Sequence, residues 1–453
     1  LSLFGAYTYN IVENSQYLPT SVWANGQAYK GTKKRESLLG NMMLTYKKNW
    51  KKHFFDVLAL AELQKETYTG YYTTVSNFST DKFGYNNLQA GALRLWEGTN
   101  SYYQQPRLAS FMGRFNYTYA DRYVLTLNAR TDASSKFGAN HKWGFFPSAS
   151  AAWVISEEEF MKQFPVIDNL KFRIGYGLAG NQSGIDSYTT LNLVKPNGVV
   201  PVGNSAIVSL GDIRNTNPDL KWEVKHTFNT GIDLAMFGNR LLLSANYYNS
   251  KTTDMLYLYN VSVPPFTYNT LLANIGSMRN WGTEIAIGIT PLKTKDMELN
   301  INANITFQRN KLLSLSGMYN GEMLSASEYK SLASLDGAGF HGGYNHIVYQ
   351  MVGQPLGVFY LPHSTGLESD GNGGYTYGIA DLNGGGVSLE DGEDRYVAGQ
   401  AVPKTILGSN ISFRYKRFDL SLQINGAFGH KIYNGTSLTY MNMNIFPDYN
   451  VMK

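Results

Sequence analysis

The chain has 453 residues, of which 43% are hydrophobic, 14% aromatic and 16% charged. Charged residues are scarcer than the roughly 25% usual in soluble domains. The sequence contains no cysteine, which excludes disulfide frameworks, thiolate metal sites and thiol catalysis. The net charge is +5, and no basic block with interleaved aromatic residues occurs, so nucleic-acid binding has little support.

A membrane helix is not expected, because no stretch approaches the ~18 apolar residues that one needs. A membrane location would therefore require a closed β-barrel, since only helices and barrels satisfy every backbone polar group in lipid. The first residues, 1–7, already alternate as a strand does.

A two-residue period runs along the chain. Residues 297–308 alternate without exception between apolar and polar side chains, and residues 170–178 and 418–425 do the same. Successive side chains of a strand point to opposite faces, so each segment has one apolar and one polar face. The pattern predicts about thirteen strands, near 1–12, 36–47, 53–66, 107–119, 123–132, 143–155, 169–179, 222–236, 240–252, 278–291, 297–310, 405–415 and 418–428.

The length of these segments favours a membrane barrel. Strands of soluble sandwiches are usually about 5–6 residues long, whereas a tilted transmembrane barrel strand needs about 9–11. Most of the predicted strands reach that length. The fold class expected is therefore all-β, an antiparallel transmembrane β-barrel.

Short and long links alternate between the predicted strands, with the compact link at 133–142 as an exception. Outer-membrane barrels alternate short periplasmic turns with longer external loops. The strand at 297–310 must then run outward, so about 311–404 is predicted to be a large extracellular loop insertion. Thirteen is an odd number, whereas bacterial barrels have even numbers of strands, so the chain is expected to be a fragment of a barrel.

Aromatic residues gather where several predicted strands end, which is typical of an interfacial girdle. The alternative is the ordinary β-propensity of aromatic residues. The residues concerned are Tyr117, Tyr119, Tyr123, Tyr247, Tyr248 and Tyr415.

A series of motifs in fixed order resembles a known family. The series includes RTDASSKFG at 130–138, WGFFPS at 143–148, NPDLKWE at 217–223, GSMRNWG at 276–282 and GQPLG at 353–357. Together these motifs resemble the SusC/RagA family of TonB-dependent outer-membrane transporters.

The resemblance implies that residues 1–453 are the later part of a 22-stranded barrel whose N-terminal plug is not in this sequence. It implies the outer membrane of a Gram-negative bacterium, of the Bacteroidota, and contact with outer-membrane lipid. It also implies import of oligosaccharides or peptides, energised by the TonB complex through the plug and assisted by a SusD-like surface lipoprotein. A TonB-dependent transporter for siderophores or vitamins, and a secreted β-rich glycan-binding adhesin, remain as alternatives.

No catalytic residue is predicted. The seven histidines are scattered, and no H-E-x-x-H, G-x-S-x-G or phosphate-binding P-loop occurs. The chain is therefore not expected to be an enzyme.

Aromatic side chains in the link at 93–103 are candidates for substrate binding, because rings and amides can stack on sugars or grip a peptide. They are Trp96, Tyr102 and Tyr103. Packing between loops, or contact with the lipoprotein, is the alternative. The polar faces of two strands are expected to line the barrel lumen, where simple hydration is the alternative to solute contact. The lumen candidates are Lys171, Arg173, Glu298, Asn300, Asn302 and Asn304.

One loop is a candidate calcium site. Asp381 and Asn383 place oxygen ligands at alternate positions before a run of glycines, as at the start of a calcium loop. Gly385 stands where the third oxygen ligand would be expected. A polar glycine-rich loop without metal is the alternative.

Overall fold

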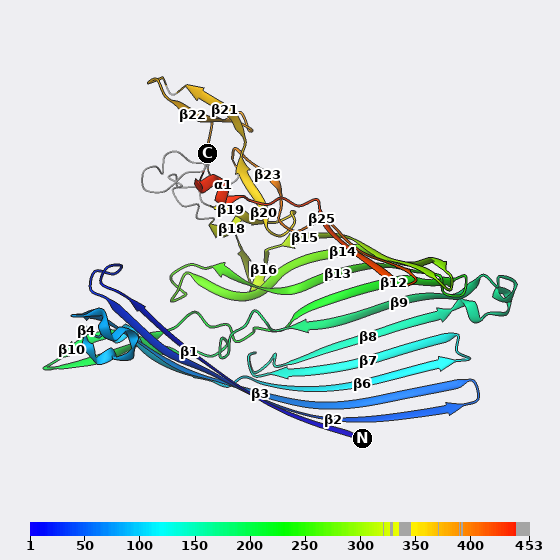
Figure 1. The fold of residues 1–453 in the computed structure, drawn as a ribbon. Coiled ribbons are helices and arrows are strands. Elements are labelled where there is room, and N and C mark those ends of the chain that lie inside the picture. Colours follow the sequence, from blue (N-terminus) through cyan, green and yellow to red (C-terminus); the bar gives the residue numbers. More distant parts are fainter. Residues whose placement is uncertain are drawn as a thin grey trace. The chain divides into compact units, whose positions relative to one another are not determined.

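The computed structural model describes residues 1–319, 321–326, 329–334, 346–369, 371–388, 390 and 393–440. Most of them form antiparallel strands, and thirteen strands follow one another in one large sheet (Figure 1). The thirteen strands predicted from the sequence are the ones observed, so the all-β, barrel-like class is confirmed. They are β1 (Ser2–Leu18), β2 (Gln27–Trp50), β3 (His53–Phe78), β6 (Arg107–Tyr119), β7 (Tyr123–Ser134), β8 (Trp143–Val154), β9 (Ile167–Asn181), β12 (Glu223–Met236), β13 (Leu241–Asn260), β14 (Thr270–Lys293), β15 (Met297–Ser314), β24 (Thr405–Tyr415) and β25 (Phe418–Phe428).

The chain divides into two compact units, which are described separately. Unit 1 comprises Leu1–Tyr117, Thr126–Ser148 and Gly180–Trp222, and unit 2 comprises Thr118–Leu125, Ala149–Ala179 and Glu223–Lys453. Among the described residues, no helix has the length and apolar character that a membrane crossing would need.

Unit 1 contains the long β2–β3 hairpin, which pairs from Gln27 with Ser76 down to Trp50 with His53. The turn joining them is two residues long, and Lys51 takes the left-handed conformation at φ 54°. Two short strands, β4 (Gly91–Leu93) and β5 (Thr99–Gln104), add to β3. The remaining elements are η1 (Asp81–Asn86), η2 (Leu88–Ala90), η3 (Trp96–Gly98) and the hairpin of β10 (Val194–Val202) and β11 (Ser205–Asp212).

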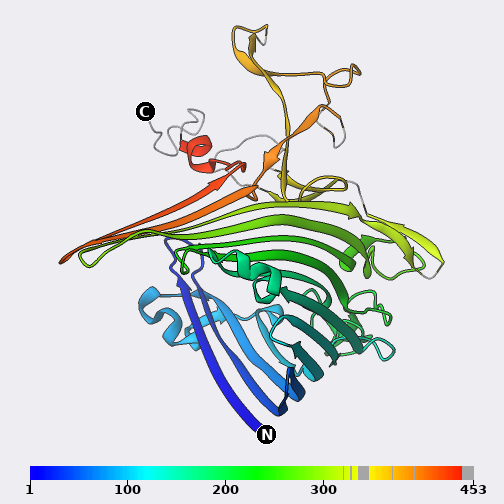
Figure 2. The same cartoon turned by 90° about the vertical axis from the view of Figure 1, so that its right-hand side faces the viewer.

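Unit 2 contains the run β12 to β15, followed by β24, which pairs with β15, and by β25, which pairs with β24 (Figure 2). Two 3-10 helices, η4 (Ile155–Glu157) and η5 (Glu159–Gln163), lie between β8 and β9. Small sheets occupy the long connection between β15 and β24. Their strands are β16 (Ser316–Tyr319), β17 (Glu322–Ser325), β18 (Tyr329–Ser334), β19 (His346–Met351), β20 (Val358–Pro362), β21 (Ser364–Ser369), β22 (Tyr375–Ile379) and β23 (Arg395–Gln400); helix α1 (Gly435–Tyr440) follows β25.

Several strands are longer than the sequence predicted. β3 continues to Phe78 instead of ending near residue 66, and β13 and β14 extend as a hairpin into the predicted link at 253–277. The backbone pairing continues where the apolar-polar alternation has stopped, because hydrogen-bonded ladders do not require an apolar face. Tyr247 and Tyr248 therefore lie inside β13, so their predicted place at a strand end is wrong, and their membership of an interfacial girdle stays a prediction.

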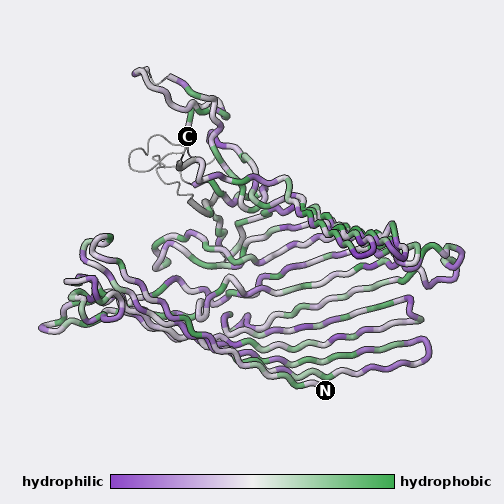
Figure 3. Tube along the Cα trace, viewed as in Figure 1, coloured by the Kyte–Doolittle hydropathy of each residue, from purple (hydrophilic) through white to green (hydrophobic). Residues whose placement is uncertain are grey.

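Cross-strand register sorts the side chains of unit 2 into two faces. Residues that pair directly share a face, and the alternation of polar and apolar positions is visible along the strands in Figure 3. One row is apolar and consists of Ile289, Ile301, Ile411 and Leu422. The adjacent row points to the other face and consists of Gly288, Asn302, Asn410 and Gln423.

The apolar face of these strands is not the buried core of the unit. Leu299, Ile301 and Ile305 are only half-buried. A buried cluster forms instead where strands extend into the connections, around Tyr259, Leu271 and Leu312. This arrangement differs from a sandwich, in which apolar faces are packed between two sheets.

Motifs that are far apart in sequence meet in unit 1. The rings of Phe137 and Trp222 lie 4.7 Å apart, and Phe146 packs edge-on against Trp222 at 5.5 Å. The Trp222 indole N–H donates to the Lys142 carbonyl at 3.2 Å. A Cβ at Gly138 would lie 1.7 Å from the Pro218 carbonyl oxygen, so only glycine fits there. Three motifs of the series, at 130–138, 143–148 and 217–223, thus build one packed cluster.

Candidate functional site

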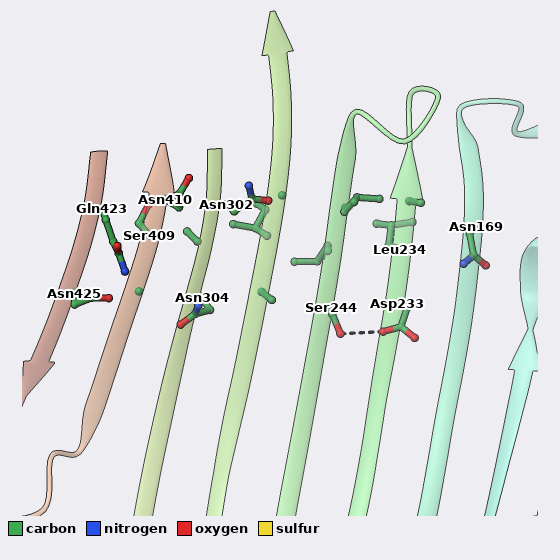
Figure 4. Close-up of a pocket in the computed structure, with 18 residues that line it drawn as sticks. Asn169, Asp233, Leu234, Ser244, Asn302, Asn304, Ser409, Asn410, Gln423 and Asn425 are labelled. Carbon is green, nitrogen blue, oxygen red and sulfur yellow. Dashed lines mark hydrogen bonds between the residues drawn. The ribbon is translucent and has the colours of Figure 1, made fainter. Parts of the chain in front are cut away.

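The candidate site is the polar face of unit 2, where a cavity of about 550 Å³ opens over the strands (Figure 4). β9, β12, β13, β14, β15, β24 and β25 all contribute residues to its wall. Because polar side chains alternate along each strand, the register brings them together on one face. Those drawn on this wall include Asp233, Ser244, Asn302, Asn304, Asn410, Gln423 and Asn425.

Amides dominate the part of the wall formed by β15, β24 and β25. Asn302 pairs with Asn410, which in turn pairs with Gln423. Gly408 lies beside Asn304, and a Cβ there would be 3.0 Å from the Asn304 amide oxygen. Glycine at this position leaves room for the amide. The resulting surface offers both hydrogen-bond donors and acceptors without a net charge.

A charged cluster lies at Asp233. The Arg173 guanidinium donates from Nε to Asp233 Oδ2 at 2.8 Å and from Nη2 to Oδ1 at 2.7 Å. Lys171 Nζ lies 3.1 Å from Oδ2, and the Ser244 hydroxyl donates to Oδ1 at 2.9 Å. Arg173 also donates to the Asn246 amide oxygen at 2.8 Å. Both predicted cations, Lys171 and Arg173, are therefore brought together around one carboxylate.

Glu298 and Asn300 belong to a second network on β15. Arg414 donates to Glu298 Oε2 at 2.6 Å, and the Asn300 amide donates to Glu298 Oε1 at 3.2 Å. The Thr290 hydroxyl donates to the Asn300 amide oxygen at 2.8 Å. All six predicted lumen residues thus lie on polar networks or on the cavity wall, and their role toward a solute stays a prediction.

The predicted aromatic substrate ligands lie in unit 1. Tyr102 and Tyr103 are consecutive residues of β5, so their side chains point to opposite faces, and Trp96 begins η3. The Tyr102 ring covers Gly70, where a Cβ would be 2.7 Å from it. The Tyr103 hydroxyl accepts a bond from the Gln105 amide at 2.7 Å. These contacts do not bring the three aromatic residues into one site, and their binding role stays a prediction.

Sequence reasoning missed a cluster of polar residues near Tyr102. Arg35 donates to Glu66 Oε1 at 2.5 Å, and the Tyr68 hydroxyl donates to Glu66 Oε2 at 2.6 Å. The Arg35 guanidinium also lies over the Tyr68 ring at 5.6 Å. Alternation along 62–68 could have placed Glu66 and Tyr68 on one face, but Arg35 becomes their partner only through the β2–β3 register.

The predicted calcium ligands have intramolecular partners. Asp381 accepts backbone N–H groups from Gly384 at 2.6 Å and Gly386 at 3.0 Å. Asn383 donates to Glu393 and accepts from the Gly385 N–H. Within the described part of the chain, no group of three or more His, Asp or Glu residues is placed to hold a metal ion. Calcium binding by this loop stays a prediction.

The same loop is organised by Asp394, which is fully buried. Its carboxylate accepts the backbone N–H groups of Leu382 at 2.6 Å and Ser388 at 2.8 Å. These bonds hold the pKa of Asp394 below its usual value, with the Ser388 bond as the largest cause. A buried carboxylate that ties two turns together gives this loop a structural function.

Known proteins resemble the chain over nearly its whole length. The family model described as TonB dependent receptor-like, beta-barrel matches residues 1–450. TonB-dependent receptor P3 of Formosa agariphila is 32% identical over 448 residues, which is 94% of this chain and 43% of that protein. TonB-dependent receptor SusC of Bacteroides thetaiotaomicron is 27% identical over 445 residues, 93% of this chain and 41% of that protein.

Among solved structures, the RagAB peptide transporter matches with a TM-score of 0.73 and 21% identity, covering 94% of this chain and 46% of that one. At this identity the match shows the fold alone. The chain spans less than half the length of the curated relatives above. The family match and the thirteen-stranded sheet agree with the motif series. The chain therefore belongs to the TonB-dependent receptor β-barrel family, which lies in the outer membrane of Gram-negative bacteria.

Proposed function

We propose that the whole protein imports nutrients across the outer membrane, powered by the TonB complex and working with a SusD-like surface lipoprotein. The proposed cargo is an oligosaccharide or a peptide. The observation that supports this best is the polar wall of unit 2, where amides from β15, β24 and β25 form one hydrogen-bonding surface. The similarity to SusC supports the same class of transporter.

The chemistry of the wall suits both cargo classes. Asn302, Asn304 and Asn425 can donate to and accept from sugar hydroxyls, and they can do the same with peptide groups. Such contacts replace water contacts one for one, so a solute can be held weakly and released. A wall of this kind supports passage without catalysis, in keeping with a family of transporters.

Gene deletion in the host tests the proposal. The deletion strain should lose growth on one class of substrate when defined oligosaccharides and defined peptides are supplied separately as nutrients. The intact gene should restore growth. Uptake of the labelled substrate should stop when TonB is removed.

Variants of the wall refine this test. Asn302→Leu combined with Asn410→Leu should lower the uptake rate several-fold, whereas Ile301→Leu on the apolar face should leave uptake unchanged. Unaltered import of every glycan and peptide by the deletion strain would contradict the proposal, as would uptake that continues without TonB. A loss restricted to ferric chelates or cobalamin would support the siderophore or vitamin alternative instead.

A further inference from the structure

A groove of about 560 Å³ lies on the apolar face of unit 1. Its floor is a pair of glycines, Gly5 of β1 and Gly40 of β2, which lie directly opposite each other. A Cβ added to either glycine would meet nothing within 4 Å. The rim consists of large apolar side chains that remain exposed, namely Leu3, Met42, Leu63 and Phe111.

Two cations border the groove. Lys65 follows Leu63 by two residues on the same face of β3 and is exposed. The Glu66 N–H donates to the Pro106 carbonyl at 3.0 Å, so the same antiparallel register places Arg107 beside Lys65. The Arg107 guanidinium donates to the neutral amide oxygen of Gln105 at 2.8 Å. Because that oxygen carries no net charge, the contact does not neutralise the positive charge of Arg107.

The position of the cations along the strand matches the outer boundary of the membrane. The turn after Trp50 is short, which identifies the periplasmic side. From Phe55 to Lys65 the strand advances by ten residues, or about 33 Å at 3.3 Å per residue. With a tilt of about 40°, this is about 25 Å along the membrane normal, the height of the apolar band of such barrels. With Phe55, close to the short turn, taken as the start of the apolar band, Lys65 and Arg107 lie at the level of the outer-leaflet headgroups.

We propose that this groove binds lipid A, the phosphorylated glycolipid of the outer leaflet. One acyl chain lies over the Gly5–Gly40 pair, between Leu63 and Met42. A phosphate of the same lipid accepts hydrogen bonds from Lys65 and Arg107, since charge-assisted contacts of this kind are strong at a membrane surface. The phosphates of lipids in the inner leaflet are too far from the two cations.

The test uses the full-length protein, extracted from its host membrane in mild detergent and analysed by native mass spectrometry. The wild-type protein should carry a lipid A adduct. Lys65→Gln combined with Arg107→Gln should lower the bound fraction at least five-fold. Gly5→Leu combined with Gly40→Leu should lower it similarly, because the new side chains fill the groove while the charges remain.

Matched controls lie on the same face. Lys48 lies opposite Phe55 in the β2–β3 pairing, near the periplasmic end. Lys48→Gln removes this cation, and the variant protein should retain the lipid A adduct. Gly113→Leu fills another open position, where a Cβ would meet nothing within 4 Å, and should also retain it. Equal lipid A retention by the Lys65→Gln, Arg107→Gln protein and the wild type would overturn the proposal. So would adducts that contain only phospholipid. The readout needs no transport, so it is independent of the proposed import.

Discussion

At the scale of single residues, Asp233 controls the charged cluster of unit 2. It accepts hydrogen bonds from Arg173 and Ser244 and lies 3.1 Å from Lys171 Nζ. Without the carboxylate, two cations would face each other with no counter-charge. Bonds to charged groups contribute about 1.5–3 kcal/mol when well shielded. The side chains here are 26–38% exposed, so solvent screening reduces that value.

Asp233→Ala is expected to lower the free energy of unfolding by about 1–2 kcal/mol, from the charged-bond range discounted for exposure. Asp233→Asn should have a smaller effect because the amide oxygen still accepts from Arg173. Urea unfolding of the whole protein in lipid vesicles measures both. Glu13→Gln, an exposed carboxylate of β1, is the matched control and should be neutral. Equal stability of Asp233→Ala and the control would disprove the structural importance of the cluster.

Glu158 makes the link between β8 and β9 sensitive to acid. The Tyr123 hydroxyl and the Trp153 indole donate to its carboxylate at 2.6 Å and 3.1 Å, and Arg122 donates at 3.0 Å. These contacts, the Tyr123 bond foremost, lower the pKa of Glu158. The pKa of Glu158 in the folded protein lies below the usual value of a glutamate. The contacts of its ionised carboxylate therefore contribute fully to stability at any pH above that usual value. This contribution is lost as the pH falls through the lowered pKa.

We therefore expect the environment of Trp153 to change only below about pH 4.5, near the ordinary pKa of a glutamate. The difference in fluorescence between the wild type and Trp153→Phe reports on this residue alone. In Glu158→Gln the transition should be absent. A transition that persists in Glu158→Gln would assign the pH dependence to another group.

Individual side chains show where sequence reasoning stopped. Alternation placed Lys171 and Arg173 on a polar face, and the structure places them around Asp233 as a set. Asp233 itself was not singled out, because its link to Arg173 depends on the register of neighbouring strands. Arg35 and Glu66 were missed for the same reason. Periodicity gives the face of a residue, and only register gives its partner.

At the scale of elements, existence and order of the strands were predictable, but their ends were not. β2 was expected at 36–47 and runs from Gln27 to Trp50. The extra residues pair polar side chains such as Lys30 with Thr73, which leave no apolar period. We interpret the sequence signal as the mark of the part of each strand that faces lipid. Beyond that part the backbone ladder continues in water with no constraint on side-chain polarity.

The two faces of β15 give a direct test of this interpretation. Ile301→Arg, on the apolar face, should cost about 2–4 kcal/mol if the residue lies near the bilayer midplane. Asn302→Arg, on the cavity wall, should be tolerated much better because it meets water. Folding of the whole protein into vesicles, followed by urea titration, compares them. Equal costs for the two variants would contradict the assignment of faces.

The motif series was recognisable from sequence, but its physical cause was not. Phe137, Trp222 and Gly138 belong to motifs about 80 residues apart, and the structure shows them in one cluster. Their spacing in the chain gives no hint of contact, because the intervening residues include the β10–β11 hairpin and two strands. The conformation of the links, unlike that of the strands, is not encoded in a periodic pattern of apolar and polar residues.

At the scale of the whole molecule, the alternation of link lengths predicts the orientation in the membrane. The links after β2, β6, β12, β14 and β24 are short, whereas β10, β11 and the strands from β16 to β23 lie in long connections. Short turns face the periplasm in barrels of this kind. The long segment between β15 and β24 should therefore be extracellular, as its place in the sequence predicts.

Thiol labelling tests this orientation cleanly, because these 453 residues contain no cysteine. Asn204→Cys and Asn372→Cys lie in exposed turns of long connections and should react with a membrane-impermeant maleimide on intact cells. Lys52→Cys and Lys295→Cys lie in short turns, and they should react only after the outer membrane is opened. The parent protein supplies the background signal.

Because strands cross the membrane in strict alternation, one misplaced site would shift every later strand. Labelling of Lys295→Cys on intact cells would therefore reverse the orientation of β15 and place the segment between β15 and β24 in the periplasm.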